Sequence, residues 1–486
     1  MENHHKNLNE ALRRDDLLRD IINAITIPGQ QSRYICGSYI SDALAGIAPG
    51  GILLACTGNT AQAAGELAAG TGRRPVALKG REGTYTLPGK TREERSISLV
   101  PLAAQGIEGH LAGAGFTVNA MAVDLSDVQG QVRLLDPFAG LSDLSDGRLR
   151  AVSRLSVSHD PARVMVAAGL CHRYRLEPDQ ATWLTLKSTA PEVKRLAPGR
   201  AFRLLGRLFS GGGLVSRALF LRKLGVLGAM FPELEAVFDV PQNYYHHLGV
   251  WEHTVEVLRL LEEFMETPSI AFPAQSGRLA SHLEEKLEGG FDRRTYLAIA
   301  ALLHDIGKPS AMRVEPSGRI RFQGHQLEGA RLAVDIGRRL ALGHRGRSYL
   351  AGLVGQHMAF GFLIKEGEST GDRLRAVAGL GSNCIDVAML SLADRLATRG
   401  EASTREGVEL YRRTVRRAVN DYFWLQDSAP LLSGRDVLVH AGVGPGQGVS
   451  RLLFRVRVAQ KEGIIAGRAG ALEYIAPDFK GKMSGG

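Results

Sequence analysis

The sequence contains few cysteines and no long hydrophobic run. Its four cysteines are Cys36, Cys56, Cys171 and Cys384, separated by 20, 115 and 213 positions. These separations exclude a CxxC metal motif, and no disulfide framework can be inferred from them. No stretch of about 18 apolar residues occurs, and the first residues, MENHHKNLNEALRRDD, are polar. We therefore expect a cytoplasmic protein with reduced thiols and no membrane partner.

The overall composition is that of an ordinary globular protein, but one long stretch of the sequence has no aspartate. The 486 residues are 44% hydrophobic and 23% charged, which excludes disordered, collagen-like and disulfide-dense chains and predicts three or four domains. The 81 residues from Ala43 to Val123, however, contain no aspartate. Their only carboxylates are Glu66, Glu82, Glu93, Glu94 and Glu108.

Positive charge is concentrated in one segment. The chain carries 60 Lys and Arg against 50 Asp and Glu, a net charge of +10. Residues 1–149 contribute 14 basic and 16 acidic side chains, residues 150–223 contribute 14 and 4, and residues 224–486 contribute 32 and 30, so the net charges are −2, +10 and +2. A local basic excess is typical of surfaces that bind phosphate backbones, although most such runs are simply solvated helix faces.

The hydrophobic pattern changes near residue 150. Before it, short β-like runs alternate with glycine-rich turns; the runs are RYICGSYI, PVALKG, SISLVPL, VNAMAVDL and VRLLDPF. After about residue 160, apolar residues recur at a spacing of three and four, which predicts helices. We expect an α+β head followed by an all-α neck, a further helical domain and a helical carboxy-terminal region, with ranges 1–149, 150–235, 236–400 and 401–486.

Residues 267–290, TPSIAFPAQSGRLASHLEEKLEGG, interrupt the helical pattern with Pro, Ser and Gly. We expect a surface insertion between two helices there.

The strongest chemical signal is the segment ALLHDIGKP, where His304 and Asp305 end an apolar helix. Neighbouring helical residues point about 100° apart, so both reach one ion only in a groove that other helices complete. His253 and Asp394 lie on amphipathic helices and give the order His, His-Asp, Asp. A single buried histidine is usually a hydrogen-bonded core residue, but these four together predict a metal site.

This order resembles the HD-domain superfamily of metal-dependent phosphohydrolases. Mixed imidazole and carboxylate ligands suit a divalent ion such as Mn, Fe, Co, Ni or Zn, with Mg also open. The resemblance implies a catalytic role for His304 and Asp305, and a phosphate-stabilising role for Lys308.

The resemblance also bears on further histidines. His325 and His357 match positions that complete a second metal site in some HD subfamilies, where Asp305 would bridge the two ions. His246 and His247 match a family HH element, for which we expect a structural or substrate-proximal role.

Most of the chain, roughly residues 30–480, is similar to the tRNA nucleotidyltransferase/poly(A) polymerase family, namely class II CCA-adding enzymes of the bacterial type with an HD domain. The segments that carry the resemblance are GFTVNAMAVDL, VRLLDPFAGLSDLSDGRLRAV, SHDPARVMVAAGLCHRY and the tail from PLLSGRDVLVH to ALEYI. The family pairs incoming bases with a carboxylate and an arginine, which correspond to Asp160 and Arg163. We add Arg154, Arg200 and Arg203 from the basic segment as RNA-binding or nucleotide-binding candidates.

The head departs from the family at its catalytic motifs. Where the family has GG-x-V-R-D, the chain keeps Gly37 and Asp42 but has Ser38 and Ser41. The expected D-x-D strand is GGILLACTG, and the Arg-Arg-Asp before FT-x-N is replaced by AGAG. Two Mg ions need clustered carboxylates, so we expect that nucleotidyl transfer has been lost, unless a glutamate from another strand has taken over. For Asp42 we expect a capping or turn role.

Three functions follow from these observations. The first is an HD phosphohydrolase or phosphodiesterase fused to a head that binds RNA, such as a tRNA 3′ end, or a nucleotide; by resemblance its substrates are phosphomonoesters, 2′,3′-cyclic phosphates or nucleotides. The second is an active CCA-adding or poly(A)-polymerase-type nucleotidyltransferase. The third is a non-catalytic RNA-binding protein.

Overall fold

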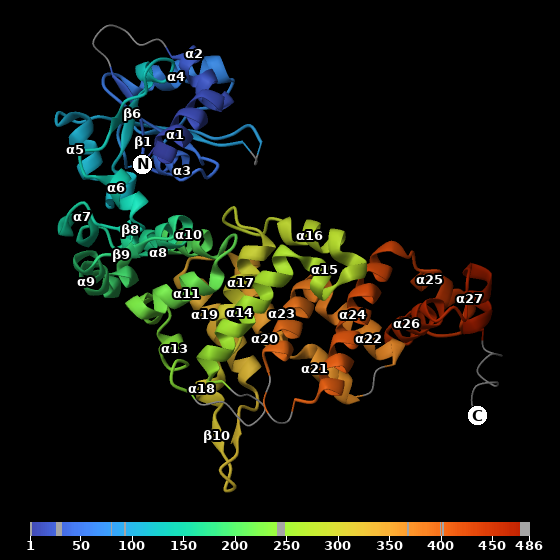
Figure 1. Ribbon diagram of the computed structural model, residues 1–486. Helices are drawn as coiled ribbons and strands as arrows, with labels where there is room; N and C mark the ends of the chain where they lie inside the picture. The colour runs from blue at the N-terminus through green and yellow to red at the C-terminus, as the bar shows by residue number, and fades with distance from the viewer. Residues whose placement is uncertain are drawn as a thin grey trace. The chain divides into compact units, whose positions relative to one another are not determined.

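The computed structural model describes residues 2–25, 32–78, 80–91, 94–240, 248–366, 369–398, 400 and 403–476. These form two compact units, Met1–Ala197 with Leu219–Met230, and Pro198–Ala218 with Phe231–Gly486. The first unit contains a mixed α/β head and short helices, and the second is helical apart from one hairpin (Figure 1). The expected fold class, an α+β head followed by helical regions, is confirmed.

A seven-stranded sheet in the order β3-β4-β5-β2-β1-β6-β7 organises the head. The strands are β1 (Arg33–Cys36), β2 (Ile52–Cys56), β3 (Val76–Ala77), β4 (Tyr85–Leu87), β5 (Ile97–Pro101), β6 (Ala122–Asp124) and β7 (Leu134–Leu135). β1 runs antiparallel to β2, and β2 runs parallel to β5. The registered residues Ile35, Leu54 and Leu99 are all fully buried, so this face of the sheet packs into the core.

The head helices are α1 (Glu2–Arg14), α2 (Asp16–Ala24), α3 (Ser38–Leu44), α4 (Thr60–Thr71), α5 (Gly106–Ala112) and α6 (Gly140–Ser145), with short 3-10 turns η1 (Thr117–Asn119) and η2 (Leu125–Asp127). Each of the five β-like runs expected from the sequence contains a strand.

The rest of the first unit is mainly helical. It contains α7 (Arg154–Ser158), α8 (Ala162–Tyr174), α9 (Gln180–Thr189), η3 (Ala190–Arg195), α12 (Val226–Met230) and the short pair β8 (Arg148–Leu149) and β9 (Glu177–Pro178). α8 buries Val164, Met165 and Ala168, and α9 begins at Asp179, whose carboxylate accepts a hydrogen bond from the Thr182 backbone. α11 (Leu214–Leu224) spans the division between the units.

The second unit is built around two almost fully buried helices, α17 (Arg293–Leu303) and α23 (Cys384–Ala397). A helix that is apolar on all sides is stable only when other helices surround it. The helices that pack against them include α10 (Pro198–Phe209), α14 (Val250–Glu266), α20 (His344–Gln356), α21 (Ala359–Glu366), α22 (Thr370–Leu380) and α24 (Arg405–Asp427). The unit also contains α13 (Pro232–Glu235), α18 (Lys308–Ala311) and α19 (His325–Arg339), of which α19 packs on α18 and α20.

The segment Thr370–Ala397 is long and apolar enough to cross a membrane by composition alone, with a mean hydropathy of 1.5. However, 67% of the 18-residue stretch to which this hydropathy applies is buried within the protein, as expected for a core helix. The 3-10 turn η5 (Gly381–Asn383) also interrupts the segment.

The segment 267–290, expected as a surface insertion between two helices, lies between α14 and α17 and has many exposed residues, but it is itself largely helical. This segment forms α15 (Pro268–Ala271), η4 (Pro273–Gln275) and α16 (Ser276–Glu284), which bury Phe272, Leu279 and Leu283. The prolines stand at helix starts, where a missing N–H costs nothing, rather than in an exposed loop.

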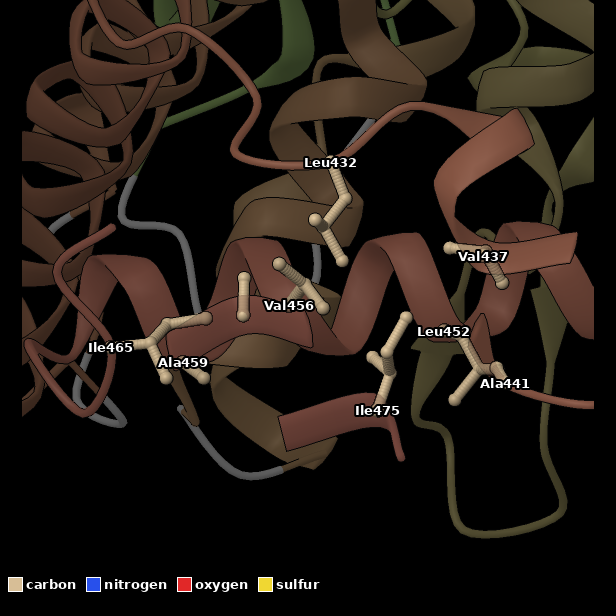
Figure 2. Packing of buried hydrophobic residues seen from close by; sticks show 9 residues of the cluster. Leu432, Val437, Ala441, Leu452, Val456, Ala459, Ile465 and Ile475 are labelled. Carbon is tan, nitrogen blue, oxygen red and sulfur yellow. The ribbon is translucent and has the colours of Figure 1, made fainter. Parts of the chain in front are cut away.

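The last three helices have a core of their own. They are α25 (Gly434–His440), α26 (Gln447–Lys461) and α27 (Arg468–Ile475). Figure 2 shows Val437, Leu452, Val456 and Ile475 converging between them. Ser433 begins α25 with a reciprocal capping box to Asp436.

Candidate metal centre and nucleotidyltransferase-like head

The first group of candidate metal ligands comes from three helices. His253 lies in the first turn of α14, His304 directly follows α17, and Asp394 lies near the end of α23. The Nε2 atom of His253 is 2.9 Å from Oδ1 of Asp394, and Nε2 of His304 is 4.0 Å from the same oxygen. One ligand atom from each residue lies within 4.8 Å of the others, a spacing that one ion can bridge.

The second group is joined to the first through consecutive residues of one turn. It consists of Asp305, His325 at the start of α19 and His357 at the end of α20. Nε2 of His325 lies 3.3 Å from Oδ1 of Asp305 and 3.3 Å from Nε2 of His357. Because His304 of the first group is 3.1 Å from Oδ2 of Asp305, the Asp305 carboxylate faces both groups.

Backbone carbonyls orient three of the four histidines. The Nδ1 atoms of His304, His325 and His357 each lie 2.7–2.8 Å from the carbonyl oxygen of the residue three positions earlier, namely Ala301, Phe322 and Val354. An Nδ1–H that donates to a carbonyl leaves Nε2 as the lone-pair donor, the arrangement that metal-binding histidines use. The buried Nε2 of His304 has no hydrogen-bond partner, which fits a ligand atom.

The electrostatics at this site favour ionised carboxylates and a neutral His357. Burial opposes protonation of His304, but the charges of Asp305 and Asp394 outweigh it and raise the pKa of this histidine. Burial, reinforced by His304, lowers the pKa of His357 to about 4. Burial would raise the pKa of Asp394, but the hydrogen bond and charge of His253 hold that pKa well below its usual range. Burial also opposes ionisation of Asp305, yet the charges of His304 and Lys308 keep its pKa low. The ionised carboxylates and neutral His357 are in the forms that divalent metals bind, whereas His304 would release its proton on binding an ion.

Two further features define the chemistry of the centre. Nζ of Lys308 lies 2.7 Å from Oδ2 of Asp305, and both side chains are buried. Asp394 is the most exposed ligand candidate, with 22% of its side chain accessible, whereas the side chains of His253, His304 and Asp305 are at most 3% exposed.

Apolar side chains gather on one face of the head sheet. Cys36, Leu53 and Ser98 are in register across β1, β2 and β5, so their side chains share one sheet face. Leu53 and Cys36 pack with Leu111 and Ile107 of α5. Among the described residues, groups of three or more His, Cys, Asp or Glu side chains spaced to hold a metal ion occur only in the two clusters of the second unit.

Asp42 is engaged inside the head. Its carboxylate accepts hydrogen bonds from Nε of Arg173 at 2.6 Å and from the Tyr174 hydroxyl at 2.7 Å, and the Gly50 backbone donates to it at 3.3 Å. The Gly50 contact closes the turn after α3, in line with the turn role expected from the sequence. The ion pair with Arg173 of α8, whose side chain is partly exposed, could not be inferred from the sequence.

The neck candidates are placed differently from one another. Asp160 accepts from the backbone of Ala162, while the guanidinium of Arg163 donates to the carbonyls of Ser156 and Gly113. Arg154 is exposed at the start of α7. Arg200 and Arg203 lie on α10 in the second unit, and Arg203 is exposed. His246 and His247 lie outside the described residues.

The orienting carbonyls of Ala301, Phe322 and Val354 were not expected from the sequence. The sequence pattern could have indicated them, because His304 and His357 stand at the carboxyl ends of helices. Backbone carbonyls there have no partner within the helix and can accept from a histidine side chain.

Comparison with known proteins identifies relatives of both halves. Residues 250–399 match the model of the HD domain. The chain is 31% identical over 381 residues to the A-adding tRNA nucleotidyltransferase of Deinococcus radiodurans, covering 77% of this chain and 79% of that protein. It is 32% identical over 259 residues to the CC-adding tRNA nucleotidyltransferase of Thermus thermophilus, covering 52% of this chain and 51% of that protein.

The fold is also found among solved structures. The Thermotoga maritima CCA-adding enzyme complexed with tRNA superimposes with a TM-score of 0.60 over 96% of this chain and 97% of that chain, at 16% identity. A CCA-adding enzyme with ATP gives the same TM-score over 94% of this chain and 90% of that chain, at 15% identity. At these identities the likeness concerns the fold.

Proposed function

The chain belongs to the tRNA nucleotidyltransferase family, in the CCA-adding group that carries an HD domain, and from this premise we propose that its HD domain hydrolyses phosphate esters with a bound divalent metal ion. The observation that carries the proposal is the pair of histidine and aspartate groups joined at Asp305. Expected substrates are phosphomonoesters, 2′,3′-cyclic phosphates or nucleotides, in the cytoplasm.

The donor set fits a borderline divalent ion. His253, His304 and Asp394 would hold one ion, and Asp305, His325 and His357 a second. When bound, such an ion supplies a water of lowered pKa and polarises a phosphoryl oxygen. The Asp305 carboxylate and the backbone carbonyls behind the histidines hold the ligands in position. Lys308, 2.7 Å from Asp305, balances the charge of that carboxylate and lies where it can offset charge on a phosphate.

The test is metal analysis combined with a panel of phosphate monoesters and diesters. Purified protein is expected to contain divalent metal and to hydrolyse at least one ester class. The double variant His304→Ala with Asp305→Ala is expected to lose both properties, while His440→Ala, an exposed histidine of α25, keeps them. Metal-free protein together with unchanged hydrolysis in the double variant would overturn the proposal.

We further propose that the head no longer transfers nucleotides, and that the head and the basic neck (residues 150–235) bind RNA or a nucleotide. The proposed contact residues are Asp160, Arg163 and Arg154 in the first unit, and Arg200 and Arg203 in the second. Support comes from the apolar face around Leu53 and from the net charge of +10 in residues 150–223.

Nucleotidyl transfer is the second candidate, and the relatives favour it over its loss. Both curated relatives named above are tRNA nucleotidyltransferases, and the first covers 77% of this chain. Incubation of the protein with tRNA, Mg and labelled CTP or ATP separates the two candidates. Efficient incorporation establishes transfer; its absence, alongside incorporation by a relative in the same assay, supports a head that only binds.

A non-catalytic RNA-binding role is the third candidate. Salt-sensitive RNA binding without turnover at either site would select it.

A further inference from the structure

A short β-hairpin lies in the sequence between Lys308 and His325, two residues of the candidate metal centre. Its strands are β10 (Arg313–Val314) and β11 (Ile320–Arg321), and Figure 1 shows it standing away from the helices beside α18. Its only sheet partners within the described chain are each other.

The base of the hairpin touches the centre directly. The carbonyl oxygen of Phe322 lies 2.8 Å from Nδ1 of His325, and the Phe322 ring lies 5.4 Å from Nζ of Lys308. A ligand held along the hairpin would therefore be guided toward the phosphate-binding end of this site.

One face of the hairpin is rich in arginine. Arg313 pairs directly with Arg321, and the Glu315 backbone donates to the carbonyl of Arg319 at 2.8 Å. Because alternate residues of a strand share a face, these four side chains project on the same side, with a net charge of +2. Like charges directly opposite one another destabilise a strand pair. Glu315 forms an ion pair with Arg321 at 2.5 Å, and the four side chains together keep an excess of positive charge that suits an anion.

The opposite face is apolar and exposed. It carries Val314, 62% exposed, and Ile320, which is half-buried. A surface with arginines on one side and aliphatic side chains on the other matches single-stranded RNA, which offers phosphates along one edge and the flat faces of its bases along the other.

We propose that residues 312–322 form a binding arm for the RNA strand whose terminal phosphate ester enters the metal centre. The inference rests on the proposed hydrolysis and specifies its substrate as an RNA end rather than a mononucleotide. An acidic protein partner would use the arginine face alone, without the apolar face, so RNA is favoured.

The experiment compares two triple variants of the full-length protein that remove equal charge. The first is Arg313→Ala, Arg319→Ala and Arg321→Ala. The matched control is Arg331→Ala, Arg338→Ala and Arg345→Ala, which changes exposed arginines on α19 and α20. Binding of a fluorescent single-stranded RNA is measured by anisotropy over a range of salt concentrations. Hydrolysis is measured on an RNA ending in a 2′,3′-cyclic phosphate and on 2′,3′-cyclic AMP.

The hairpin variant is expected to weaken RNA binding on the order of tenfold and to reduce the slope of log Kd against log salt by about 2, since each phosphate contact on a single strand contributes about 0.7. Its kcat/KM should fall for the RNA but not for cyclic AMP, and the control variant should resemble wild type. Equal RNA binding by the two triple variants would overturn the inference, as would an equal loss on both substrates.

Failure of the proposed hydrolysis gives a different result. If wild type turns over neither ester with any divalent metal, the hydrolysis proposal fails, and the anisotropy comparison alone decides whether the arm binds RNA. A wild-type protein that binds an acidic polypeptide, but no RNA, through these arginines would replace the arm with a protein-docking surface and contradict the inference.

Discussion

Asp305 is the single residue on which both ligand groups depend. Its two carboxylate oxygens face His304 at 3.1 Å and His325 at 3.3 Å, and its charge is balanced by Lys308. If each group holds an ion as proposed, a carboxylate that faces both groups would couple the occupancy of the two positions.

Asp305→Ala is therefore expected to remove metal from both positions, whereas His357→Ala should affect only the second. Metal content by mass spectrometry should fall to background in the first variant and remain near one ion per chain in the other. Hydrolysis by the Asp305 variant should fall by at least about 100-fold, more than is typical when a residue that only supports a metal ligand is changed. Asp335→Ala, an exposed residue of α19, is the control. Normal metal content in the Asp305 variant would contradict this account of the ligands.

Asp15 links stability of the head to pH. It begins α2, accepts from the backbone of Leu18, and receives bonds from Arg95 and the Tyr39 hydroxyl. Burial would raise its pKa, but the bonds from Arg95 and Tyr39 lower it below the usual value of 3.8. A carboxylate whose pKa is lowered by folding stabilises the folded state above its unfolded pKa, and this contribution disappears as the pH falls through the folded value.

Asp15→Asn should therefore lower the free energy of unfolding by on the order of 2 kcal/mol at neutral pH. The difference from wild type should shrink at pH values below about 3.8. Urea unfolding at neutral pH and at the lowest pH that preserves the fold measures both quantities. A difference that stays constant with pH would show that the carboxylate charge is not responsible.

At the scale of elements, α25, α26 and α27 are held by their own hydrophobic contacts. Val437 is fully buried in this cluster, whereas Val439, two residues later on α25, is 67% exposed. The two valines allow the same substitution to be tested with and without burial on one helix.

Val437→Ala is expected to destabilise these helices by about 1–3 kcal/mol, because it removes buried methyl groups and leaves a small cavity. Val439→Ala should change stability by less than about 0.5 kcal/mol. Hydrogen exchange resolved by segment would locate the loss in α25–α27. Equal effects of the two substitutions would be inconsistent with the packing shown in Figure 2.

At the scale of the whole molecule, charge and chemistry are segregated along the chain. Residues 150–223 hold an excess of +10, while the candidate metal ligands all lie between His253 and Asp394. Under the proposed function, such a division would separate recognition of a polyanion from the reaction on it.

The double variant Arg154→Ala with Arg203→Ala should accordingly weaken tRNA binding several-fold. It should also reduce the slope of log Kd against log salt by about 1–2. Hydrolysis of a mononucleotide should not change. The matched control changes Arg13 and Arg14, exposed residues of α1, to alanine. If the control weakens tRNA binding as much, the basic segment has no special role.

The sequence predicted the head sheet and the helical remainder because strand and helix periodicities are local properties of the chain. It also singled out the six candidate ligands that lie in the two groups, because each stands in a recognisable short context. It could not predict the carbonyl partners of the histidines or the ion pair between Asp42 and Arg173, which is set by the packing of α3 and α8. The helices at 268–284 were missed because prolines at helix starts look like loop residues when burial is unknown.

The most direct test of metal-dependent hydrolysis is metal add-back on protein first stripped with a chelator. Hydrolysis of the ester panel should be absent in the stripped protein and return as Mn, Co, Ni, Fe, Zn or Mg is titrated, for wild type and His440→Ala but not for His304→Ala. Equal hydrolysis by stripped and reloaded wild type, or full recovery in His304→Ala, would contradict the assignment of the reaction to this centre.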